Sequence, residues 1–176
     1  FAYDVKTFTI GSSTYAMVTG YEDHGVQMID ISNPAVIVAK DAETDGANGF
    51  DKIEGVYGIA TFGIPSNSTY RGAVITGNTD DSVMTVDITN PTAIFEHDVE
   101  IDGANSFTEL DGPRGVAVWN STDNTYAIVV SQTDDGVQII DISNPADISA
   151  KDSATDSENG FTELNGAHAV TVWNPT

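Results

Sequence analysis

Acidic residues recur along this chain at spacings that suit a bound calcium ion. Asp98, Glu100, Asp102, Gly103 and Glu109 fit the pattern D-x-E-x-D-G-x5-E, which is close to a calcium-binding loop. Ca²⁺ takes about six to eight hard oxygen ligands, and the glycine lets the chain wrap around the ion. The sequence therefore predicts a calcium site at this loop, with a solvated acidic loop as the alternative.

Two further loops carry weaker versions of the same pattern. The partial ligand sets are Asp41, Glu43, Asp45 and Gly46 in one loop, and Asp152, Asp156 and Glu163 in the other. Lys52 replaces the last ligand of the first set, and Ala154 and Ser157 interrupt the second. Each loop also contains a phenylalanine (Phe50, Phe107 or Phe161) that we expect to hold the loop in a groove between neighbouring units.

Four unlike side chains form a second candidate site. Tyr3, Tyr57, Arg114 and His168 are separated by 54, 57 and 54 residues, and each stands at or just before the start of a short apolar run. Polar and aromatic groups placed once each could bind a ligand, or serve as polarising and acid–base groups of a hydrolase or lyase. The sequence has no nucleophile elbow, phosphate loop or histidine pair at metal spacing, so we assign no catalytic residue.

Two short motifs concern modification. Asn67-Ser68-Thr69 and Asn120-Ser121-Thr122 are N-glycosylation acceptor patterns in equivalent loops. Unmodified polar loops are the alternative. Together with the strong acidity, the two patterns favour an extracellular or cell-surface location.

Composition limits the partners. Six Lys and Arg stand against 27 Asp and Glu, which gives a formal charge of −21. Nucleic acids and anionic membranes attract basic surfaces, so neither is expected as a partner. There is no cysteine, and no apolar run approaches the length of a membrane span. A hydrophobic content of 40% in short runs indicates a folded chain.

The elements that must position these side chains repeat. Gly136–Pro145 (GVQIIDISNP) recurs almost unchanged at 25–34 and more loosely at 82–91. In the third copy, 115–119, 125–130, 137–142 and 147–154 read as four strands, with a hairpin turn at 132–136. The repeat divides the chain at about 1–50, 51–107, 108–161 and 162–176. Core positions are expected at Val116, Val118, Ile128, Ile139 and Ile140.

Repeated four-stranded units are typical of β-propeller blades. The segments TYAMVTGYEDHGVQMIDISNP, TYRGAVITGNTDDSVMTVDITNP and TYAIVVSQTDDGVQIIDISNP resemble the LVIVD-repeat family. That resemblance implies an all-β propeller of surface or secreted type and says little about function. We expect three four-stranded antiparallel blades and one extra inner strand at 167–173. Either a longer ring or association with another copy would complete them.

Blade topology also predicts where the candidate sites lie. The 2→3 turns and the long acidic loops should share one face, the two acceptor asparagines should lie on the opposite face, and the four unlike side chains should ring the channel mouth. The favoured function is a non-enzymatic binding or structural module that presents acidic loops, with calcium as its possible cofactor. A protein, a polysaccharide or further copies of the repeat would be its partner. A propeller enzyme working at the channel mouth is the alternative.

Overall fold

The computed structural model describes residues 1–173 and consists of three antiparallel sheets of four strands each. Blade 1 contains β1 (Ala2–Ile10), β2 (Ser13–Gly20), β3 (Gly25–Asn33) and β4 (Val36–Thr44). Blade 2 contains β5 (Val56–Ile64), β6 (Asn67–Gly77), β7 (Ser82–Asp87) and β8 (Phe95–Ile101). Blade 3 contains β9 (Pro113–Asn120), β10 (Thr125–Ser131), β11 (Gly136–Asp141) and β12 (Ser149–Thr155). The predicted all-β fold with three four-stranded blades is confirmed.

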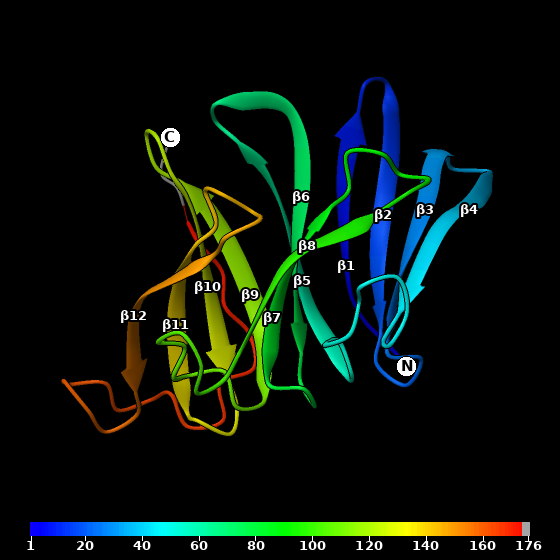
Figure 1. The fold of residues 1–176 in the computed structure, drawn as a ribbon. Helices are drawn as coiled ribbons and strands as arrows, with labels where there is room; N and C mark the ends of the chain where they lie inside the picture. Colours follow the sequence, from blue (N-terminus) through cyan, green and yellow to red (C-terminus); the bar gives the residue numbers. More distant parts are fainter. Residues whose placement is uncertain (174–176) are drawn as a thin grey trace.

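The blades stand side by side, from blade 1 in blue and cyan to blade 3 in yellow and orange (Figure 1). Within each blade the strands pair in chain order, and contacts between blades run mainly through β1, β5 and β9, the inner strands. Hydroxyl groups tie these inner strands together. Thr19 Oγ1 donates to the carbonyl of Tyr57 at 2.8 Å, and Thr76 Oγ1 donates to the carbonyl of Arg114 at 2.9 Å.

The hydrophobic core lies between the blades. One buried cluster joins Met17 and Met28 of blade 1 to Ile75 and Met84 of blade 2, with Phe50 among them. A second cluster joins blades 2 and 3 around Phe107 in the same way. The first two acidic loops therefore each leave one blade, insert a phenylalanine between two blades, and enter the inner strand of the next. This confirms the groove expected for Phe50 and Phe107, which are fully buried.

Two core predictions need correction. Val116 and Ile140 are buried and Val118 packs against their cluster, but Ile128 and Ile139 are only partly buried. These two side chains belong to blade 3, beyond which residues 1–173 form no further sheet. Phe161 is 43% exposed for the same reason, whereas its counterparts Phe50 and Phe107 are 0% exposed.

The predicted extra inner strand also differs. Residues 167–173 are not in a strand, because no second strand of a fourth blade is present to pair with them. They still take the place of one: Ala169 Cα lies 2.8 Å from the position of a Cβ added at Gly115. Residues 174–176 of the predicted segment lie outside the described residues. Within residues 1–173 no helix is long and apolar enough to cross a membrane.

Candidate functional site at the channel mouth

The four unlike residues predicted from the repeat spacing lie in contact with one another. The rings of Tyr3 and Tyr57 are 4.2 Å apart between centroids. The guanidinium carbon of Arg114 lies 4.7 Å from the Tyr57 ring centre, and Arg114 Nη1 donates to the Tyr57 hydroxyl at 3.0 Å. The same nitrogen is 3.1 Å from Nδ1 of His168. The structure thus places these side chains in one line across the starts of three successive inner strands.

Tyr21 extends this line and was not predicted. Its ring centroid is 5.2 Å from that of Tyr3 and 6.3 Å from that of Tyr57. Tyr21 follows β2, where the equivalent residues of the other blades are Asn78 and Gln132. Comparing the repeats at the turns, as well as at the inner strands, would have revealed it. We call Tyr3, Tyr21, Tyr57, Arg114 and His168 the channel-mouth row.

The charge state of the row follows from its donors. A guanidinium can only donate hydrogen bonds, so Nδ1 of His168 must accept from Arg114. The imidazole is then neutral and carries its hydrogen on Nε2. Among the ion pairs of the described residues, none includes Arg114. The row therefore offers N–H donors and aromatic faces, with Tyr3 46% exposed and His168 also exposed to solvent.

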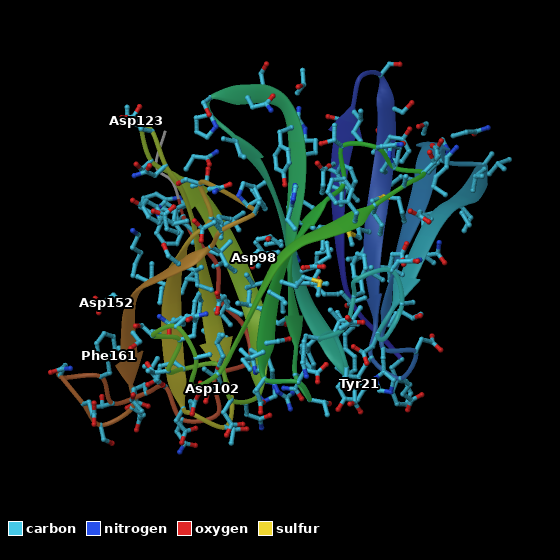
Figure 2. The ribbon with its side chains drawn as sticks, viewed as in Figure 1. Tyr21, Asp98, Asp102, Asp123, Asp152 and Phe161 are labelled. Atoms are coloured by element: carbon cyan, nitrogen blue, oxygen red, sulfur yellow. The ribbon has the colours of Figure 1, made fainter. Side chains whose placement is uncertain are left out.

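The acidic loops surround this end of the molecule. Hydrogen bonds join each loop to a 2→3 turn: Gly55 N–H donates to Nδ1 of His24, and Gly112 N–H donates to Asp81 at 2.9 Å. Figure 2 shows Tyr21 and Asp102 at one end of the blades and Asp123 at the other. The predicted separation of the acidic loops from the Asn120 loop is therefore seen.

The structure does not bring the predicted calcium ligands together. Asp102 Oδ1 accepts the backbone N–H of Leu110 at 3.1 Å, which braces its own loop. Asp98 Oδ2 accepts the N–H of Ile148 at 2.8 Å, which fastens blade 2 to blade 3, and Glu100 accepts from the Asn105 amide. These three carboxylates thus accept hydrogen bonds from different groups of the protein.

The other loops repeat this arrangement. Asp45 Oδ1 accepts from Ile53 N–H, Asp41 Oδ2 accepts from Ile94 N–H, and Glu43 Oε2 accepts from the Asn48 amide. Among residues 1–173, no three His, Asp or Glu side chains are grouped closely enough to hold a metal. Calcium binding stays a prediction that this geometry does not support.

Glu109 is buried, as Glu43 is, but of these two only Glu109 has a buried carboxylate oxygen without a partner. Its Oε1 accepts from the Thr155 hydroxyl at 2.7 Å, while its Oε2 has no hydrogen-bond partner among the described atoms. Asp134 lies in the turn nearby. Burial raises the pKa of the Asp134 carboxyl to about 6, and the charges of Asp102 and Glu109 add to the rise, against the hydrogen bond from the Asp111 N–H.

Replacing Asp134 with asparagine should stabilise the fold at neutral pH. A carboxyl whose folded pKa is raised favours the folded state when protonated, and this contribution is lost as the pH rises from about 4 through about 6. Asparagine keeps the acceptor for the Asp111 N–H without the charge. Because the side chain is partly exposed, we expect a gain of only about 1 kcal/mol at pH 7.5 and none near pH 4.

Urea denaturation at both pH values measures this effect. Asp141→Asn is the control, because its pKa is lowered: burial opposes the shift, but hydrogen bonds from Ser143 and from Lys151 outweigh it. This variant should lose stability at pH 7.5. Equal free energies of unfolding for Asp134→Asn and the parent at pH 7.5 would show that the charged carboxylate of Asp134 does not destabilise the fold.

Comparisons with known proteins agree with the architecture. Residues 13–41 and 123–156 match the model of the LVIVD repeat. A protein from Lactobacillus plantarum has a similar structure, with a TM-score of 0.61 and 13% identity over 92% of this chain and 44% of its own. The periplasmic gluconolactonase of Pseudomonas aeruginosa reaches a TM-score of 0.61 at 12% identity, over 87% of this chain and 39% of its own.

A third similar structure is the exo-β-1,3-galactanase of Phanerochaete chrysosporium with galactose, with a TM-score of 0.61 and 10% identity over 86% of this chain and 35% of its own. No protein with a curated function matches the sequence significantly. The chain spans less than half the length of each of these three structures. Their sequence identities are low, so the similarity shows the fold alone. The chain therefore folds as β-propeller blades, and two of its segments match the LVIVD repeat.

Proposed function

We propose that this chain is a non-enzymatic binding module and that its ligand binds at the channel-mouth row. The contact of Tyr3, Tyr57, Arg114 and His168 in one line carries this proposal. These residues belong to four different repeats and are unlike one another, whereas the surrounding frame is repetitive. A regular scaffold that places different groups at one accessible point is suited to recognising one asymmetric ligand.

A neutral carbohydrate fits the chemistry of this row. Tyrosine rings present apolar faces that can cover a sugar ring, and their hydroxyl groups can bond to its edge. The guanidinium has five N–H donors. Nη1 already serves Tyr57 and His168 and Nε is buried, so the two donors of Nη2 are left for sugar hydroxyls. A chain charge of −21 repels anionic ligands such as uronates. The galactanase among the similar structures adds a motive for testing neutral sugars first.

Replacing Arg114 with alanine should weaken sugar binding at least about tenfold, since a hydrogen bond from a charged donor contributes about 1.5–3 kcal/mol. Titration calorimetry with neutral galacto- and gluco-oligosaccharides measures the dissociation constant. Arg71→Ala is the matched control, because Arg71 donates to Ser68 and Tyr70 carbonyls in blade 2, away from the row. If no neutral sugar binds the parent, or if both variants bind like the parent, the site is wrong.

An enzyme at the same row is the competing function. Arg114 and His168 are its best candidates, because they are unlike groups in direct contact. Against it, the neutral imidazole accepts from Arg114 and no hydrogen bond joins the row to a carboxylate among the described residues. Substituting both residues with alanine separates the two functions. Lost turnover of a sugar substrate with unchanged binding would favour the enzyme.

We also propose an extracellular location for the module. Asn67 begins β6 and Asn120 ends β9, so they are strand-end residues and not the loop residues expected, and both are exposed at the end of the blades opposite the channel-mouth row. Glycans on them would leave the row and the acidic loops open to a polysaccharide or protein partner. Intact-mass measurement of native material tests this, since an unmodified mass would remove the argument from glycosylation.

A further inference from the structure

Neighbouring blades of this molecule contact each other through two different faces. One such face is uncovered on blade 1, and the complementary face is uncovered on blade 3. We call the side of a blade that faces the preceding blade its upstream face, and the other side its downstream face. A cavity of about 430 Å³ lies on the upstream face of blade 1, between Val18, Gly25 and Gln27. In blades 2 and 3 the corresponding face is covered by the incoming acidic loop, with Phe50 or Phe107 fully buried.

The downstream face of blade 3 carries the matching loop. Phe161 follows Phe107 by 54 residues and is 43% exposed, with Val137 and Ile139 partly exposed beside it. Figure 2 shows Phe161 in the loop beyond β12, at the free side of the molecule. Phe161 is thus the counterpart of the phenylalanines that cover the upstream faces of blades 2 and 3, but among the described residues no blade packs against it.

The hydrogen-bonding groups of the two faces are complementary as well. Between blades, Asp41 Oδ2 accepts from Ile94 N–H at 2.7 Å, and Asp98 Oδ2 accepts from Ile148 N–H at 2.8 Å. The next members of this series are Asp152 on the downstream face of blade 3 and Ile37 on the upstream face of blade 1. Ile37 is 71% exposed, whereas Ile94 and Ile148 are 4% and 3% exposed.

A second hydrogen bond between a blade and the loop that precedes it indicates the same pairing of faces. Gln138 Oε1 accepts the backbone N–H of Thr108 in the preceding loop at 3.1 Å. Gln27 holds the equivalent position in blade 1, and its amide nitrogen donates to the backbone carbonyl of Asp41 just as that of Gln138 donates to the backbone carbonyl of Asp152. Thr162 follows Phe161 as Thr108 follows Phe107. Gln27 and Thr162 can therefore form the pair seen between blades 2 and 3, which the junction of blades 1 and 2 lacks because Met84 takes the place of the glutamine.

We propose that the upstream face of blade 1 binds the downstream face of blade 3 from a second copy of this chain. Two copies would supply six blades, which lies within the range of about 4–8 that closes a propeller ring. One copy spans 44% of the similar Lactobacillus plantarum protein, so two copies approach the size of that structure. Both interfaces of such a dimer repeat the junction already present between blades 2 and 3.

Residues 167–173 stand where β1 of the incoming copy must lie. They form no strand pairing, whereas β1 is paired with β2 from Val5 to Ile10. The incoming β1 therefore replaces this segment, and Tyr3 of the second copy takes the place of His168 beside Arg114. The association thus changes the His168 end of the channel-mouth row, and light scattering without sugar tests it independently of sugar binding.

Light scattering of the 176-residue chain tests the proposal. We use about 0.5 M NaCl, because screening shortens the range of repulsion between two copies of charge −21. The expected mass is twice 18.6 kDa. Ile37→Asp should raise the dissociation constant at least about tenfold by placing a charge in the junction. Val36→Asp is the matched control, because its counterpart in blade 3 is the exposed Asp147, and it should leave the dimer intact.

A mixing experiment establishes that the contact is head to tail. Phe161→Ala and Ile37→Asp damage opposite faces, so each variant alone should be largely monomeric with an unchanged far-UV circular dichroism spectrum. Mixed together they can form one intact junction, and heterodimers should appear. A monomeric parent at about 100 µM, a dimer that Ile37→Asp leaves unchanged, or no heterodimer on mixing would each overturn the proposal.

Discussion

Replacing Phe107 with alanine is expected to lower the free energy of unfolding by about 3–5 kcal/mol. Phe107 is fully buried in the cluster between blades 2 and 3, where it lies with Val83 of blade 2 and Val129 of blade 3. Removing the ring loses its transfer free energy and leaves a cavity that two sheets cannot close without moving together. Denaturation in urea, followed by circular dichroism on the monomer at low concentration, measures the loss.

Phe161→Ala is the matched control for this prediction. It removes the same side chain from the equivalent position of the next loop, where the ring is 43% exposed. We expect a loss below about 1 kcal/mol, because little apolar surface returns to water. Similar losses for the two variants would mean that the phenylalanine stabilises its own loop and not the contact between blades.

The repeat register accounts for most of what could be predicted about the fold. Because Asp30, Asp87 and Asp141 recur with the same neighbours, they mark the third strand of each blade, and the sheets follow in order. The fourth strand was placed too early in blade 3. Asp147 lies in a turn, where its N–H donates to the carbonyl of Asn144, and the strand starts only at Ser149. Local hydrophobicity does not reveal such a turn bond.

Four of the five residues of the channel-mouth row could be predicted as a set, but their geometry could not. Equal spacing identifies Tyr3, Tyr57, Arg114 and His168 as equivalent positions, and equivalent positions on inner strands converge on one channel. The stacking of Tyr57 under Arg114 depends on side-chain directions across two blades, which spacing does not contain.

The hydrogen bonds of the predicted calcium ligands could not be predicted, for a different physical reason. The sequence shows which carboxylates are near one another along the chain, but it does not show which backbone N–H groups need acceptors. Asp102 serves the amide of Leu110 within its loop, and Asp98 serves that of Ile148 in the next blade. Buried backbone amides without a partner cost free energy, so they compete successfully for these oxygens.

Replacing Gly58 with alanine is expected to cost about 3 kcal/mol and to weaken ligand binding at the channel-mouth row. A Cβ at Gly58 would overlap the backbone carbonyl of Arg114, which cannot rotate away as a flexible side chain could. Gly58 N–H also donates to Thr76 Oγ1 at 2.8 Å, and that hydroxyl donates to the same Arg114 carbonyl. Strands β5 and β9 must therefore separate, which displaces Arg114 from Tyr57.

Gly63→Ala is the control within the same strand. The nearest atoms to a Cβ at Gly63 are 3.6 Å away, which is ordinary contact, so this variant should be neutral or gain up to about 1 kcal/mol. Urea denaturation of both variants gives the two free energies, and calorimetry with the neutral oligosaccharides gives the two affinities. If both variants keep the stability of the parent, the close approach of β5 and β9 does not require a glycine at position 58. If Gly58→Ala is destabilised yet binds sugar like the parent, the ligand does not depend on the position of Arg114.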